Sequence, residues 1–247
     1  MKKISKAVVI STLLASFASL STEITLTSQD NFNLKADYFK GQEKGTRAVL
    51  MLHQCNFNRS MYDNMGEQLA KKGIHALSLD FRGYGESINE EYNDKEIQAL
   101  PQQERREKWR AMAVHWPSDV KIAYDYLKGK LSKGGTIGVI GASCGGHQAI
   151  TLAENEAVTA IGFFSSAQWD ENIARYKTSL ATKPTLIIAA EEDDKTFTSA
   201  QALFVAAQHP QSKMISFKGK DHGYPLFELD KNLNETMVDW FANQLAK

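Results

Sequence analysis

Residues 139–150 read VIGASCGGHQAI, and this stretch decides how the chain is expected to fold. An apolar run ends at Ile140, and a helical pattern follows within a few residues. Between them, residues 141–145 fit G-x-S-x-G, a strand–turn–helix pattern that presents a nucleophile at the tip of a buried strand. The residues two positions before and after the central one must be small, because the turn is sharp and strained.

Two adjacent side chains could occupy the centre of this turn. Glycines lie two positions before and two positions after Ser143, and equally small residues lie at the same places around Cys144. Steric fit alone therefore does not show which of the two is the nucleophile. The register favours Ser143, because Gly141 follows the apolar strand at once. A serine there has a helix N-terminus behind it, where free N–H groups favour a developing anion. We therefore predict Ser143 as the nucleophile.

The rest of the chain alternates between strand and helix patterns. Strands are predicted over 22–28, 32–39, 47–54, 74–81, 136–142, 158–166, 184–191 and 213–219, and helices over 60–73, 118–130, 145–156, 171–180, 199–208 and 229–246. The fold class is therefore α/β: one doubly wound, mostly parallel sheet with two N-terminal antiparallel strands and helices on both faces. Ligand sites in such sheets lie at the carboxyl ends of the strands.

Residues 1–21 read as a signal peptide. Three lysines precede a short apolar stretch from Ala7 to Leu20, and small residues follow, with Ala18 and Ser21 as alternative cleavage points. The stretch is too short and serine-rich for a membrane span, so no span is expected after processing. We expect an exported protein, periplasmic or secreted, with residues 22–247 forming a single domain. An uncleaved anchor is the alternative.

Net charge and the motifs that the sequence lacks limit the kinds of partner to expect. The 247 residues carry no net formal charge, which gives no indication of a nucleic-acid partner. Metal-ligand and phosphate-loop motifs are missing from the sequence, so no metal and no cofactor are predicted. The expected partner is a small-molecule substrate.

A serine hydroxyl needs a base, and the expected chain order for this architecture is serine, acid, histidine. His222 follows the last predicted strand in a loop that can reach the turn, whereas His147 lies in a helix and His209 at the wrong edge. The acid should end the preceding strand, where four carboxylates follow one another. Asp193 is the choice, with Asp194 as the alternative, and its role is to orient the imidazole.

A polar insert at about residues 88–116 interrupts the regular alternation. It lies in a strand-to-helix connection at the edge of the sheet where the site is expected, so it is either a lid or binding loop or a solvated excursion. Trp109, Trp116 and Tyr224 could line an acyl pocket, although aromatic residues at such places are more often part of the core.

These features together resemble the α/β-hydrolase superfamily, in particular small serine hydrolases near the dienelactone-hydrolase and lysophospholipase-like branches. The resemblance includes residues 80–87, DFRGYGES, which are similar to the D-x-R-G-x-G-x-S segment of the family, and the acid and histidine loops AAEEDD and DHG. Dienelactone hydrolases have cysteine at the centre of the turn. Ser143 in that place favours ordinary esterase chemistry.

The resemblance also implies an oxyanion hole. The residue after a His-Gly dipeptide normally gives one N–H and the residue after the nucleophile gives the other, which here are Cys55 and Cys144. Gln54 replaces the glycine of that dipeptide, and it could project into the site as an added donor. Two donors that converge on one oxygen bring their Cα atoms within disulfide range, and export exposes them to oxidation. Either the two cysteines form a disulfide, or they are two independent buried residues.

The sequence thus predicts an exported serine hydrolase that cleaves a carboxylic ester or a related acyl substrate through an acyl-enzyme on Ser143. An exported peptidase or amidase with the same fold is one alternative. A non-catalytic binding or thiol-redox protein that keeps the fold is the other.

Overall fold

The computed structural model describes residues 21–246. All but the last residue of the predicted signal peptide therefore lies outside the described residues. Within the described range, no helix combines the length and the apolar character that a membrane crossing requires.

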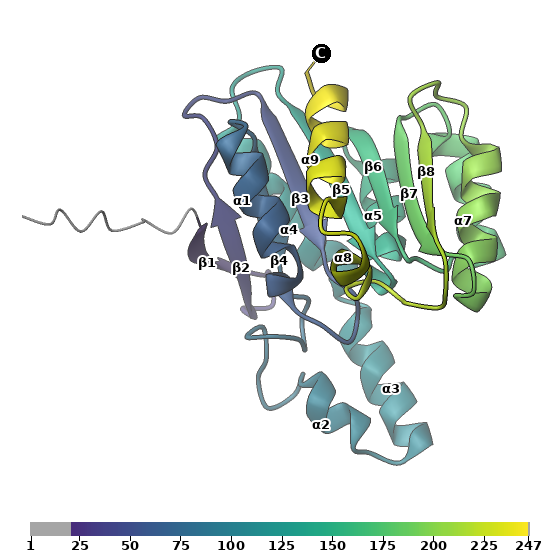
Figure 1. Ribbon diagram of the computed structural model, residues 1–247. Helices are drawn as coiled ribbons and strands as arrows, with labels where there is room; N and C mark the ends of the chain where they lie inside the picture. The colour runs from purple at the N-terminus through teal and green to yellow at the C-terminus, as the bar shows by residue number, and fades with distance from the viewer. Residues whose placement is uncertain (1–20, 247) are drawn as a thin grey trace, which may run out of the picture.

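One sheet of eight strands organises residues 21–246, in the order β1-β2-β4-β3-β5-β6-β7-β8 (Figure 1). The strands are β1 Ser21–Thr27, β2 Asn33–Phe39, β3 Arg47–Leu52, β4 His75–Leu79, β5 Thr136–Ala142, β6 Val158–Phe164, β7 Thr185–Ala190 and β8 Lys213–Phe217. β2 pairs antiparallel with both β1 and β4, and every other pair is parallel. This arrangement confirms the predicted sheet.

Helices cover both faces of the sheet because its central strands are apolar on both sides. The helices are α1 Asp63–Lys71, α2 Asp94–Gln98, α3 Gln102–Ala113, α4 Trp116–Lys130, α5 Cys144–Asn155, α6 Asp170–Arg175, α7 Asp194–Ala206, α8 Leu226–Leu229 and α9 Leu233–Gln244, with a 3-10 turn at Arg59–Tyr62 and a π-helical turn at Tyr176–Leu180. α1 and α9 pack on one face and α4 and α5 on the other (Figure 1). The core is therefore divided between the two faces.

The predicted C-terminal helix over 229–246 is wrong in its bounds. The structure has a short α8 and a separate α9, with residues 230–232 between them. The Asp230 carboxylate accepts a hydrogen bond from the backbone N–H of Asn232 at 2.8 Å. Such a local side-chain turn competes with helix continuation, and the apolar periodicity did not reveal it.

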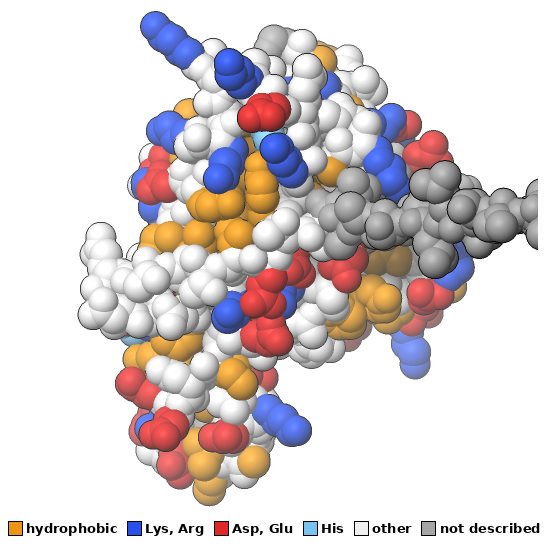
Figure 2. All heavy atoms as spheres, turned by 90° about the vertical axis from the view of Figure 1, so that its left-hand side faces the viewer, with side chains coloured by type: hydrophobic (Ala, Val, Ile, Leu, Met, Phe, Trp, Pro, Cys, Tyr) orange, Lys and Arg blue, Asp and Glu red, His pale blue; other side chains and the backbone are white. Residues whose placement is uncertain are grey.

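The polar insert contains two helices, α2 and α3, which project beyond the body of the protein at the end of the sheet where α8 lies (Figure 1). Figure 2 shows this part of the surface as a lobe that carries side chains of both charges together with apolar ones. Met112 and Trp116 anchor the C-terminal end of the insert to the body of the protein, because both side chains are buried in the core. The insert is therefore ordered structure beside the carboxyl ends of the strands.

Candidate active site

Ser143 occupies the centre of the turn between β5 and α5. Its backbone has φ 48° and ψ −116°, a positive-φ conformation that a residue other than glycine rarely adopts. A Cβ added to Gly141 would overlap the backbone of Gly145, and one added to Gly145 would lie 2.6 Å from the Leu52 carbonyl oxygen. The two glycines that flank Ser143 are thus required, and the strained central position belongs to Ser143.

Neighbouring groups hold this strained turn in place. The Ser143 N–H donates to the carbonyl of Phe164 at 2.9 Å. The Ser143 carbonyl accepts the Ser166 hydroxyl at 2.6 Å and the Gly146 N–H at 3.0 Å. Because both backbone groups of Ser143 are fixed, the direction of its side chain is set by the end of β6 as well as by the turn itself.

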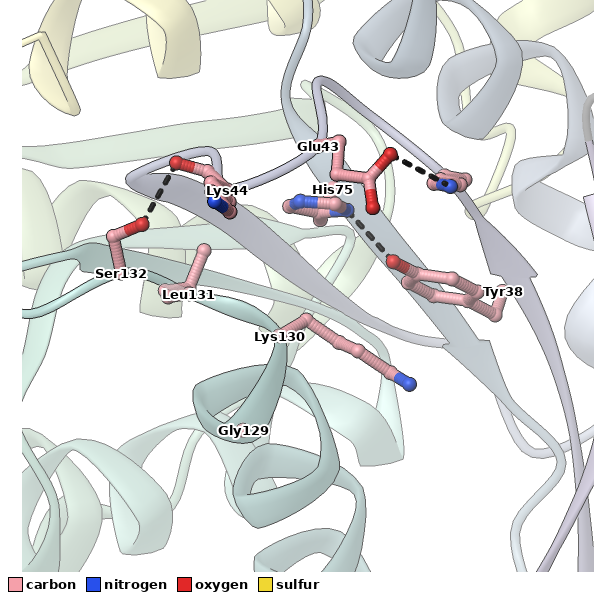
Figure 3. Close-up of a pocket in the computed structure, with 9 residues that line it drawn as sticks. Tyr38, Glu43, Lys44, His75, Gly129, Lys130, Leu131 and Ser132 are labelled. Atoms are coloured by element: carbon pink, nitrogen blue, oxygen red, sulfur yellow. Dashed lines mark hydrogen bonds and ion pairs between the residues drawn. The ribbon is translucent and has the colours of Figure 1, made fainter.

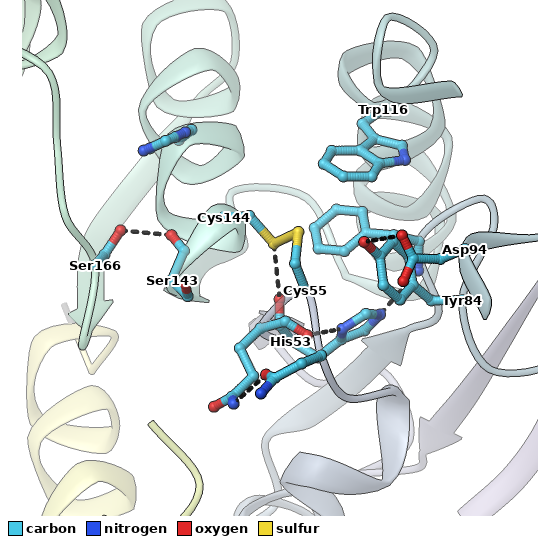
Figure 4. The surroundings of a disulfide bond; sticks show 12 residues. His53, Cys55, Tyr84, Asp94, Trp116, Ser143, Cys144 and Ser166 are labelled. Carbon is cyan, nitrogen blue, oxygen red and sulfur yellow. Dashed lines mark hydrogen bonds between the residues drawn. A yellow bond between two sulfur atoms is a disulfide. The ribbon is translucent and has the colours of Figure 1, made fainter. Parts of the chain in front are cut away.

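Cys144 is joined to Cys55 by a disulfide, with the two Cα atoms 5.8 Å apart (Figure 4). Among the described residues no cysteine is free. This decides between the two expectations for the pair, and it leaves Cys144 no thiol with which to act as a nucleophile. The bridge ties the loop after β3 to the first residue of α5.

The disulfide brings two backbone donors to one place. Within residues 21–246, neither the N–H of Cys55 nor that of Cys144 donates a hydrogen bond to another protein group. Cys144 is the first residue of a helix, where N–H groups have no intrahelical acceptor. The structure thus places both predicted oxyanion donors side by side, unpaired, next to Ser143.

His53 holds the loop that carries Cys55. Its Nδ1 donates to the Gln54 carbonyl at 2.7 Å, and its Nε2 accepts the Phe81 N–H at 3.1 Å. The ring is fully buried, and burial lowers the pKa of His53 to about 4. The imidazole is therefore neutral near pH 7, with one nitrogen donating and the other accepting.

His222 and Asp193 form the hydrogen-bonded pair expected from the sequence. Asp193 Oδ2 lies 2.6 Å from His222 Nδ1, which leaves the other ring nitrogen, Nε2, for a substrate-side role. Of the neighbouring acids, Glu191 pairs with Lys218, whose hydrogen bond lowers the pKa of that carboxyl group. Asp194 belongs to the first turn of α7. Asp193 is thus the acid that the structure joins to the histidine.

The other two candidate histidines are engaged elsewhere. His147 donates from Nε2 to the Ala167 carbonyl at 2.7 Å and packs against Trp169, and burial lowers its pKa. His209 accepts the Gln211 N–H at 3.2 Å in the loop before β8. Neither contacts Asp193, in agreement with the choice of His222.

Two of the predicted substrate-binding residues need correction. Trp116 is 2% exposed, donates from its indole N–H to the Arg82 carbonyl at 3.1 Å and packs against Phe81, so it is core and not a pocket wall. Gln54 is 3% exposed, and protein groups occupy both ends of its side-chain amide. It does not project freely into the site. The sequence could not show the bond to Tyr224, because that residue lies 170 positions away in the chain.

Tyr224, the third of these residues, is half-buried and lies two residues after His222 in the same loop. Its ring stacks on Phe57 with the ring centroids 4.5 Å apart. Phe57 belongs to the loop that carries Cys55. Tyr224 therefore links the loop that carries His222 to the loop that carries Cys55, and no pattern in the sequence indicates Phe57 as its stacking partner.

A groove of about 1020 Å³ lies between residues 55–58, which follow β3, and the insert. One wall is the loop of Cys55, the other is α2, and the floor is the segment after β4. Asp80 fixes that floor by accepting the backbone N–H groups of Arg59 at 2.6 Å and Glu86 at 2.9 Å. Tyr84 joins floor and wall through a 3.0 Å hydrogen bond to Asp94 (Figure 4).

A second cavity of about 430 Å³ lies where β4 begins, and therefore at the opposite end of the parallel strands. Tyr38, His75 and Lys130 contribute to its lining (Figure 3). None of the predicted site residues lines it. Among residues 21–246, no group of three or more histidine, cysteine or acidic side chains is placed to hold a metal ion.

Residues 36–243 match the dienelactone hydrolase family. The chain belongs to this family of hydrolases. No curated protein sequence matches it.

Solved structures share the α/β-hydrolase fold over nearly the whole chain. The Pyrococcus furiosus esterase Pf2001 is 17% identical, with a TM-score of 0.67, over 97% of this chain and 98% of that one. The dienelactone hydrolase from Anabaena variabilis is 18% identical, with a TM-score of 0.66, over 92% and 99%. An esterase from Exiguobacterium antarcticum is 16% identical, with a TM-score of 0.62, over 89% and 99%.

Proposed function

We propose that this member of the dienelactone hydrolase family is an exported serine esterase that acts through an acyl-enzyme on Ser143. The single observation that carries the proposal is the strained, glycine-flanked position of Ser143 beside two unpaired N–H groups. Strain of this kind is maintained only when the surrounding structure requires it. The Asp193–His222 pair supplies the base that a serine nucleophile needs.

The reaction follows from the roles of these groups. Ser143 Oγ attacks the ester carbonyl carbon while His222 Nε2 takes the hydroxyl proton, and the N–H groups of Cys55 and Cys144 receive the negative charge on the carbonyl oxygen. His222 then gives the proton to the alcohol oxygen, the ester bond breaks, and the acyl group remains on Ser143. Water, deprotonated by His222, releases the carboxylic acid and restores the serine.

Export is part of the proposal, and the disulfide supports it. Disulfides persist in oxidising compartments and are rare in the cytosol. The signal-like residues 1–21 point the same way. Fractionation of the producing cell into cytoplasm, periplasm and medium, followed by N-terminal sequencing, tests both points. A mature chain that begins near residue 19 or 22 is expected in the periplasm or medium, and a protein found only in the cytoplasm with Met1 intact would count against export.

The nucleophile is tested with a fluorophosphonate probe and peptide mapping. Label is expected on Ser143, and the Ser143→Ala and His222→Ala variants are expected to lose turnover of a small activated ester while they keep the native fold. Substantial turnover in both variants would overturn the assignment. A panel of matched ester and amide substrates separates an esterase from a peptidase or amidase with the same machinery.

A further inference from the structure

Gln54 has two hydrogen-bond partners, and one of them belongs to the loop of the proposed base. Its side-chain oxygen accepts the backbone N–H of Tyr224, two residues after His222, at 2.8 Å. Its side-chain nitrogen donates to the side-chain oxygen Oδ1 of Asn56 at 2.5 Å. Because Gln54 is buried, losing either partner would leave a polar group unsatisfied away from water.

Gly223 completes this contact. Its φ is +70°, and a Cβ built on it would overlap the side-chain oxygen of Gln54. The family resemblance leads one to expect a glycine at position 54, and this chain instead has a long amide there and a glycine opposite it. The two positions are sterically complementary, so the amide of Gln54 fits into space that only a glycine leaves open.

The backbone on either side of Gln54 is fixed independently. His53 is held by the Phe81 N–H, and Cys55 is held by its disulfide to Cys144. The side chain of Gln54 therefore extends from an anchored backbone. The histidine loop, in contrast, has no regular secondary structure between Phe217 and Leu226 and contains two positive-φ glycines.

We propose that Gln54 is a positioning residue, which holds the backbone after His222 and so keeps the imidazole in place to take the proton of Ser143 in the proposed reaction. Asp193 fixes the ring from one side through Nδ1, and Gln54 fixes the loop from the other through Tyr224. The inference rests on the proposed function. Misplacement of a catalytic group by about 1 Å can cost about 100-fold in rate.

The first test replaces Gln54 by a residue of similar shape that cannot accept a hydrogen bond. Gln54→Met is expected to lower kcat for a small activated ester about 10- to 100-fold, with KM changed less than about twofold. Gln244→Met is the matched control, because Gln244 is also buried but lies in α9. A kcat equal to that of the control would overturn the proposal.

The second test asks whether Gln54 acts through His222. The rate of fluorophosphonate labelling of Ser143 is measured with and without Gln54→Met, in the presence of His222 and in a His222→Ala background. Gln54→Met is expected to slow labelling only where His222 is present. The same fold-change in both backgrounds would show that Gln54 acts on the oxyanion loop or on the fold, and would overturn the positioning role.

A Gln54→Asn variant provides the same measurement if Gln54→Met does not fold, because the shorter side chain no longer reaches the backbone N–H of Tyr224. It is expected to slow labelling only when His222 is present. A wild-type protein that is folded and unlabelled at Ser143 would instead refute the proposed function. A labelled wild type with an equally fast Gln54→Met variant would refute this inference alone.

Discussion

The Nδ1 atom of His222 lies 2.6 Å from Oδ2 of Asp193, although three other acids adjoin Asp193 in the sequence. Asp193 precedes the first turn of α7, and its neighbour Asp194 begins that helix. The path of the backbone at the end of β7 therefore decides which of the four acids meets His222, and the number of acids in the run does not.

Asp193→Asn is expected to lower kcat by about 10⁴-fold while the fold is kept, because an amide stabilises the wrong histidine tautomer. Asp194→Asn removes the same charge one residue later and should change kcat by less than about threefold. Steady-state kinetics on one activated ester compares the two. Equal losses would mean that the acidic run acts as a whole and not through one carboxylate.

Replacing both Cys55 and Cys144 by serine should lower the free energy of unfolding by about 2–4 kcal/mol, since the bridge closes a loop across 89 positions of sequence. It should also lower kcat more than it raises KM, because the two donor N–H groups lose their common attachment. Urea unfolding and kinetics measure the two effects. The reduced wild type should behave like the double variant. An unchanged kcat in both would show that the disulfide is not needed to hold the two N–H groups in place.

His53 should make stability depend on pH. Its pKa is about 4 in the fold and about 6.5 when unfolded, so below pH 6.5 only the unfolded chain gains a proton. Stability is expected to be lost as pH falls from 6.5 toward 4, at up to about 1.4 kcal/mol per pH unit from this residue. Urea unfolding of wild type and His53→Asn across this range isolates the effect. Parallel curves would contradict it.

The groove beside Cys55 should select substrates by size. Ala99 lines it from the end of α2, so Ala99→Trp should lower kcat/KM for an ester with a bulky group at least about tenfold and leave a small acetate ester nearly unchanged. Gln103→Trp, on the exposed surface of α3 and away from the groove lining, is the control. If both variants discriminate alike, the groove is not where the substrate lies.

Much of the site could be anticipated from the sequence because its residues occupy fixed places in the strand order. Ser143 follows β5, Asp193 follows β7 and His222 follows β8, so strand prediction alone brings them to one edge. The contacts of Gln54 with Tyr224 and of Trp116 with Arg82 could not be predicted in this way. Each depends on which distant backbone group faces a side chain, and periodicity carries no information about that.

The insert has a different relation to the site. It leaves the body after β4 and rejoins it at α4, and it contributes no residue to the Ser143, Asp193 and His222 set. Because Met112 and Trp116 pack in the core, the part of the insert that can vary in length and composition is the stretch before Met112. A grafted segment at this point would be a starting place for engineering selectivity, since the α2 wall of the groove and the residues Ser143, Asp193 and His222 are encoded in separate stretches of the gene.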